Sequence, residues 1–231
     1  MKRMVYVLAL AAVAGCAGMR GGARESAPAA QVSDADFGRL PQDQMAPVNE
    51  ARQFLASARD EQGRAKLRLQ EATHEADMAK ADQQAAAADA QRAAAHAKVA
   101  NDSREPAQLE QARQLQEQAQ LHKSEADAHA QYAAKLAEAR QAAVKAADDQ
   151  VALGEARVDW SKLQAMQLAN VPAAGKYDAG RFQTRVNDAQ NRFDQDLQKA
   201  RQLEGQATAS QQRWQDLQKQ MQARGSAIQT G

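Results

Sequence analysis

A single cysteine, Cys16, carries the most distinctive chemistry in this 231-residue chain. It directly follows a short apolar run, residues 4–15, which Lys2 and Arg3 precede. A basic start, an apolar stretch and small residues before a cleavage point form the layout of a secretory signal peptide. The run is too short to span a bilayer as a helix, which takes about 20 apolar residues. We therefore expect residues 1–15 to be a signal peptide and the protein to be exported.

The motif Val13-Ala14-Gly15-Cys16 resembles the lipobox of bacterial lipoproteins. The resemblance implies cleavage before Cys16 and acyl chains on the sulfur and the amine of that residue. Several acyl chains give stable membrane attachment, since each buried methylene contributes about 0.8 kcal/mol. By the family's sorting pattern, Ala17 rather than Asp after the cysteine implies the periplasmic side of the cell outer membrane. The alternative is an ordinary signal peptide with an incidental cysteine.

One carboxylate–histidine pair has a spacing used by metal sites. Glu71 and His74 match the Glu-x-x-His pattern of di-metal helical bundles, and Glu125 and His129 are expected near their level on a second helix. The heptad pattern described below places Glu71 at a c position and His74 at an f position, so both should face solvent. Ligands in such bundles point inward, and we therefore expect no metal site.

Two further histidines, His122 and His129, lie seven residues apart on one helix face, with Glu125 between them. A pH-sensitive contact is one interpretation. The favoured interpretation is that both histidines are partly buried where two helices pack together.

Other candidate catalytic and ligand-binding residues have simpler interpretations. Asp148 and Asp149 are adjacent on a helix, so they should point in different directions and form no catalytic pair. Trp160 and Trp214 could stack on a ligand, but aromatic residues at helical spacing usually pack in a core. The sequence has no Gly-rich phosphate loop, zinc-type Cys/His cluster or nucleophile elbow. We expect neither enzymatic activity nor a cofactor.

The composition is typical of long helices. Charged residues make up 26% of the chain with a net charge of +1, which gives no single-sign field to favour nucleic acid. Hydrophobic residues make up 44%, mostly alanine, while aromatics make up 4% and prolines number five. Such Ala-rich, Pro-poor sequences form long helices or coiled coils. Disorder is the competing class, and the periodicity argues against it.

A heptad repeat runs without a break over residues 48–100. Its d positions are all alanine, and small side chains in one column allow helices to approach closely. The a positions are more varied. The a column is Val48, Leu55, Gln62, Leu69, Ala76, Gln83, Ala90 and Ala97; the d column is Ala51, Ala58, Ala65, Ala72, Ala79, Ala86, Ala93 and Ala100.

Turn signals divide the remaining sequence into helices at about 47–100, 104–169 and 177–224. Asp102 or Ser103 is expected to cap the second helix, with Pro106 in its first turn. Short connections favour antiparallel neighbours, and the drifting apolar stripe of the second helix indicates contact with both others. Folding the chain back in this way places Trp214 near Tyr132.

The predicted fold is therefore all-α: an elongated antiparallel three-helix coiled-coil bundle with a two-helix Ala-rich tip at residues 82–121. This helical domain covers residues 46–224. Residues 16–45 should form a lipidated flexible tether. Phe37 and Leu40 could contact the folded part, but solvation is the favoured interpretation. Residues 225–231 should form a frayed tail that begins where Gly225 ends the last helix.

This plan resembles the alanine-rich periplasmic coiled-coil lipoproteins of Gram-negative bacteria. The resemblance implies a structural or scaffolding role, with one end on the membrane and protein partners in the envelope. An accessory or adaptor subunit of an envelope transport or secretion complex is the alternative. The alanine columns could pair within one chain or between copies, so a homo-oligomer is also open.

Overall fold

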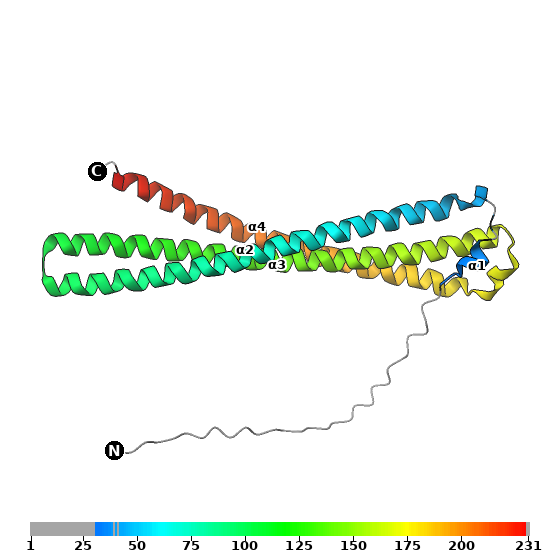
Figure 1. The fold of residues 1–231 in the computed structure, drawn as a ribbon, viewed down its shortest axis with the longest axis horizontal. Coiled ribbons are helices and arrows are strands. Elements are labelled where there is room, and N and C mark those ends of the chain that lie inside the picture. The colour runs from blue at the N-terminus through cyan, green and yellow to red at the C-terminus, as the bar shows by residue number, and fades with distance from the viewer. Residues whose placement is uncertain (1–30, 39, 41, 230–231) are drawn as a thin grey trace, which may run out of the picture. The chain divides into compact units, whose positions relative to one another are not determined.

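The described part of the chain is all helical. The computed structural model describes residues 31–38, 40 and 42–229, so the predicted signal peptide and Cys16 lie outside the described residues. In chain order the elements are α1 (Asp34–Phe37), η1 (Gln42–Met45), α2 (Ala46–Ser103), α3 (Pro106–Leu168), η2 (Pro172–Lys176) and α4 (Ala179–Gln229) (Figure 1). The prediction of an all-α fold is confirmed. None of these helices is long and apolar enough to cross a membrane.

The three long helices pack side by side in antiparallel order. The middle helix, α3, contacts both α2 and α4, as its drifting apolar stripe predicted. From α2, Arg59 reaches Glu155 at 3.3 Å and Gln83 reaches Asp127 at 2.9 Å. Because partners later in α2 lie earlier in α3, the two helices run in opposite directions.

The alanine column of α2 forms its contact with α3. All eight d-position alanines are buried, while Val48 is the only fully buried a-position residue and the others are half-buried. The heptad register is therefore confirmed. An alanine seam removes little apolar area per residue, and at about 25 cal/mol per Å² it stabilises the pair less than a leucine seam would.

The larger apolar side chains gather where α2 begins, α3 ends and α4 begins. Leu153, Leu163, Met166 and Phe182 are each exposed by 1% or less. Leu153 also belongs to a cluster that receives side chains from all three long helices; its members are Leu153, Ala156 and Ala189, with Phe54, Val186 and Phe193 packed against them. We call this end of the described helices the base.

Gly154 allows α2 and α3 to approach each other closely. A Cβ atom there would lie 3.1 Å from both Cα and Cδ1 of Leu55. We expect Gly154→Leu to lower the free energy of unfolding by about 1–3 kcal/mol, because an overpacked helix contact must shift backbone. The midpoint of urea unfolding, followed by circular dichroism, measures this.

The control substitution is Gly205→Leu on α4, where no atom lies within 4 Å of the added Cβ. This variant should gain up to about 1 kcal/mol, because leucine favours a helix more than glycine does. Equal changes in both variants would show that close packing at Gly154 is not the cause.

The α2–α3 connection differs in detail from its prediction. Neither Asp102 nor Ser103 caps the new helix: α2 continues through Ser103, whose hydroxyl donates to the Ala100 carbonyl at 2.9 Å. Arg104 then adopts a left-handed conformation (φ 57°) and ends α2. Glu105 is the residue before α3 because proline disfavours a helical conformation in its predecessor, and Pro106 occupies the first helical position as predicted.

Two predicted terminal regions also need correction. The flexible tether does not extend unbroken to residue 45, because Val32 and Phe37 are buried and α1 and η1 form within it. The prediction that Phe37 is solvated is therefore wrong. Gly225 does not end α4, which continues to Gln229, since a single glycine costs only about 1 kcal/mol in a helix.

Candidate functional site

The segment from Val32 to Phe37 packs against side chains of the other elements at the base. We call the surface that this segment covers the base cleft and define its polar residues as Arg52 on α2, Lys162 on α3, and Lys176 and Tyr177 at the end of η2. Ser33, the second residue of the segment, caps α1, because its hydroxyl accepts from the Ala35 amide at 3.3 Å.

Two acidic residues of the segment pair with the cleft. Lys162 Nζ donates to Asp34 at 2.7 Å, and Lys176 Nζ lies 3.4 Å from Asp36. The hydrogen bond and charge of Lys162 lower the pKa of Asp34. Tyr177 links both ends of the segment, because its hydroxyl accepts from the Ser33 amide at 3.0 Å and donates to Asp36 at 2.9 Å.

Phe37 fills the apolar part of the cleft, with an exposed fraction of 5%. Two cations lie over its ring: the Arg52 guanidinium at 5.6 Å from the centroid and the Lys162 ammonium at 5.4 Å. Such contacts are worth about 0.5–1 kcal/mol at exposed sites and more when desolvated. The base cleft thus binds this segment through ion pairs with its carboxylates and through cation–π contacts with the Phe37 ring.

A buried ion pair lies beside the cleft. Asp159 is 8% exposed and accepts from Arg185 at 2.8 Å. Burial raises the pKa of Asp159, although Arg185 and Lys162 oppose this shift. The pair therefore joins α3 to α4 at a desolvation cost, as buried ion pairs do.

Further along α3 and α4, two carboxylates meet. Asp149 faces Asp196, and Lys145 lies 3.1 Å from Asp196. Burial and the neighbouring carboxylate raise the pKa of Asp149, whereas hydrogen bonds from Asp149 and Lys145 lower the pKa of Asp196. Of the two carboxyls, that of Asp149 is therefore protonated more readily. Its Oδ2 atom is buried without a hydrogen-bond partner.

The raised pKa of Asp149 implies a pH dependence of stability. Its protonated form favours the fold below the ordinary aspartate pKa of about 3.9, and this contribution is lost as the pH rises through the higher folded pKa. We expect Asp149→Asn, which keeps the side chain neutral, to be more stable than the wild type at pH 7 by about 1 kcal/mol or less. The gain should disappear toward pH 4.

Urea unfolding at pH 4 and pH 7 measures this difference. Asp148→Asn is the control, because Asp148 points to α2 and accepts from Gln62 at 2.7 Å. A gain in stability for Asp149→Asn at both pH values would show that the raised pKa of Asp149 is not the cause.

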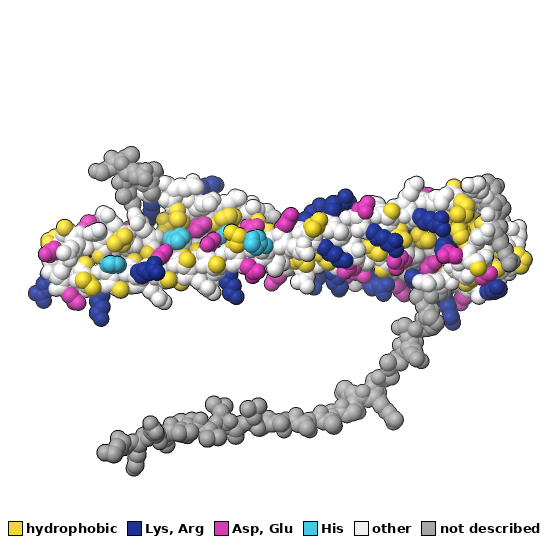
Figure 2. All heavy atoms as spheres, viewed as in Figure 1, with side chains coloured by type: hydrophobic (Ala, Val, Ile, Leu, Met, Phe, Trp, Pro, Cys, Tyr) yellow, Lys and Arg dark blue, Asp and Glu magenta, His cyan; other side chains and the backbone are white. Residues whose placement is uncertain are grey.

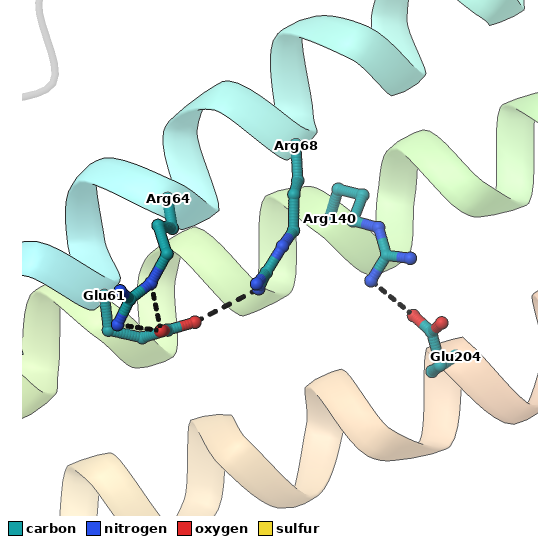
Figure 3. A network of polar contacts seen from close by, with 5 residues as sticks. All are labelled: Glu61, Arg64, Arg68, Arg140 and Glu204. Atoms are coloured by element: carbon teal, nitrogen blue, oxygen red, sulfur yellow. Dashed lines mark hydrogen bonds and ion pairs between the residues drawn. The ribbon is translucent and has the colours of Figure 1, made fainter.

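Ion pairs along the helices link neighbouring turns and helices. Figure 3 shows Glu61 between Arg64 and Arg68 on α2, at 2.9 and 3.1 Å, while Arg140 on α3 reaches Glu204 on α4 at 3.1 Å. These side chains are partly or largely exposed, and such pairs contribute about 0–1 kcal/mol each. These ion pairs form no candidate catalytic or binding site.

An aromatic stack fastens α4 to α3. The Trp214 ring stacks on both His129 and Tyr132, with centroid distances of 4.2 and 5.6 Å, and its Nε1 donates to Glu125 at 2.5 Å. The predicted proximity of Trp214 and Tyr132 is confirmed. His129 also lies 3.6 Å from Glu75 on α2, so this stack joins residues from all three long helices.

Beyond the stack, the end of α4 diverges from the α2–α3 pair (Figure 1). A groove of about 790 Å³ opens there. Its lining combines apolar and charged residues and includes Ala93, His96, Leu115, His122 and Met221. Acidic and basic side chains are interspersed along the face drawn in Figure 2, so the visible surface carries no single-sign field.

The Glu-x-x-His pair that was considered for metal binding lies on the exposed surface of α2. Glu71 and His74 are exposed, as their heptad positions predicted. His122 and His129 are partly buried, in agreement with the seam interpretation. Among the described residues, no group of three or more His, Cys, Asp or Glu side chains is arranged to hold a metal ion.

The other candidates separate as their spacing predicted. Asp148 and Asp149 contact different helices, Trp214 packs in the aromatic stack, and Trp160 is half-buried. Sequence reasoning missed the base cleft and the meeting of Asp149 with Asp196. The pattern Asp34-Ala-Asp36-Phe37, an acidic pair followed by an aromatic residue, was the available signal for the cleft's occupant.

Comparisons with protein-family models, with curated proteins and with solved structures give no match to this chain.

Proposed function

We propose that this chain is a structural or scaffolding lipoprotein of the outer membrane that presents long helices to protein partners in the periplasm. The observation that carries the proposal is the sole cysteine, Cys16, placed directly after the apolar run of a signal peptide. Acyl chains on Cys16 would supply the membrane attachment, and no enzymatic step or cofactor is part of the role.

The proposed architecture is an elongated antiparallel three-helix coiled-coil bundle with a two-helix tip. Its support is the middle position of α3 and the buried alanine column that continues to Ala100. Toward the tip, Glu117 on α3 pairs with Arg224 on α4 at 3.5 Å, whereas α2 and α3 continue past that level to their turn. Because α4 still contacts α3 at Glu117, inside the predicted tip of residues 82–121, the two-helix part is shorter than that prediction.

The groove at the end of α4 favours the adaptor alternative. A hollow lined by Leu115, Ala93 and Met221 between diverging helices is a suitable place for a further helix to dock. In that case the partner is a helical subunit of an envelope transport or secretion complex.

Photo-crosslinking in intact cells tests the proposed role. A photoreactive residue replaces Val99 or Leu115, which are 66% and 41% exposed at the tip. We expect either position to crosslink to a defined envelope protein, because a scaffold's tip meets its partner. Components of one transport or secretion complex would select the adaptor alternative.

The control position is Leu168, which is 77% exposed at the base. If the tip positions gave no products beyond those of Leu168, a tip-presenting scaffold would be contradicted.

A further inference from the structure

The segment Val32–Phe37 has the features of a bound peptide. Its anchoring contacts come from side chains far away in the sequence: Ser33 and Asp36 bind Tyr177, and Asp34 binds Lys162. Only residues 38–45 separate the segment from α2. The effective concentration of the segment at the base cleft is therefore high.

Charge complementarity defines what the base cleft accepts. Three cations surround a segment with two carboxylates, and the Lys162 side chain is only 11% exposed. A buried ammonium is costly without an anionic partner, which Asp34 supplies at 2.7 Å. Asp34 makes this contact from the outside, since its own side chain is 86% exposed, and Asp159 is a second acidic neighbour of Lys162.

Shape adds a second requirement. The Phe37 ring occupies an apolar position beneath two cations, and Val32 at the other end of the segment is 4% exposed. An acidic peptide without these apolar ends would leave both positions empty. The ligand class is thus a short acidic peptide with an aromatic residue at its carboxyl side.

We propose that the base cleft is a peptide-docking site for acidic–aromatic segments, filled by the chain's own Val32–Phe37, and that this docking holds the base as the membrane-facing end. The second clause rests on the lipid anchor of the proposed function. Residues 17–31 then separate Cys16 from the docked segment, and 15 residues span at most about 50 Å. The tip, at the far end of α2, faces away from the membrane.

Peptide binding in trans tests the docking site. The full chain carries Asp34→Lys and Asp36→Lys, which repel its own segment from the cleft. A fluorescent synthetic peptide with the sequence of residues 31–40 is titrated, and anisotropy is recorded. We expect saturable binding to this variant at least tenfold tighter than to the wild type, whose cleft is filled. High salt should weaken it.

Two controls separate docking from nonspecific attraction. A peptide with both aspartates replaced by asparagine should lose the binding, and a peptide with alanine for phenylalanine should weaken it. A third full-chain variant that adds Tyr177→Phe should bind the original peptide more weakly, because the hydroxyl that joins both ends is gone. Circular dichroism verifies that each variant keeps its helices. No binding to any variant would overturn the proposal.

Energy transfer in vesicles tests the membrane-facing clause. A dye is placed on Leu168→Cys at the base or Val99→Cys at the tip, and the acceptor is a labelled lipid. We expect strong transfer from the base, weak transfer from the tip, and less transfer from the base when Asp34→Lys and Asp36→Lys are added. Equal transfer from both ends would overturn this clause. If the chain does not attach to vesicles at all, the lipid anchor fails while peptide binding still decides the docking site.

Discussion

Replacing Phe182 with alanine should lower the free energy of unfolding by about 3–5 kcal/mol, the range for buried aromatic truncations. Phe182 is 1% exposed and the largest of the fully buried side chains. It stands in the first turn of α4 and packs edge-on against Tyr177, with ring centroids 6.1 Å apart. Its truncation would leave a cavity in the base, where the larger buried apolar side chains gather.

The loss should be measured as a shift in the midpoint of urea unfolding, with hydrogen exchange to locate it. We expect amides at the base to lose the most protection. Leu168→Ala is the matched control, because that side chain is 77% exposed and its removal should change stability by no more than about 0.5 kcal/mol. Similar effects of the two substitutions would show that the base core does not hold the helices together.

Replacing Cys16 with serine should remove the protein from the outer-membrane fraction and abolish incorporation of labelled palmitate. The hydroxyl of serine leaves the lipobox without the thiol that receives the lipid. Without the thiol, the acyl chain on the sulfur is absent. Membrane attachment should then be lost, because a single acyl chain gives only marginal binding.

The matched control is a double variant, Cys16→Ser with Ser26→Cys, which restores a thiol ten residues later outside the motif. It should remain unlabelled, because position and context determine lipidation. Persistent palmitate labelling of Cys16→Ser would refute the anchor. The helices should fold in every case, since Cys16 lies outside the described fold.

Local patterns predicted the long helices well. The d-position alanines of α2 repeat every seven residues, and each of them is buried against α3. The antiparallel order followed from the two turns, and it brought Trp214 to Tyr132. Periodicity and turn residues act over short distances, so they are visible in the sequence.

The base cleft could not be predicted in the same way. Phe37 stands in a stretch with glycine and proline that favours solvated chain, and its burial depends on Arg52 and Lys162 from distant helices. Asp149 and Asp196 meet through the relative rotation of α3 and α4. A heptad pattern in one helix does not set the rotation of its neighbour, so only the folded arrangement reveals these contacts.

Mass spectrometry of the amino-terminal peptide of the membrane-extracted protein tests the central proposal most directly. The account predicts that the mature chain begins at Cys16 and that this residue carries acyl chains on its sulfur and its amine. A chain that begins at another residue, or a Cys16 with a free thiol, would contradict the lipoprotein assignment.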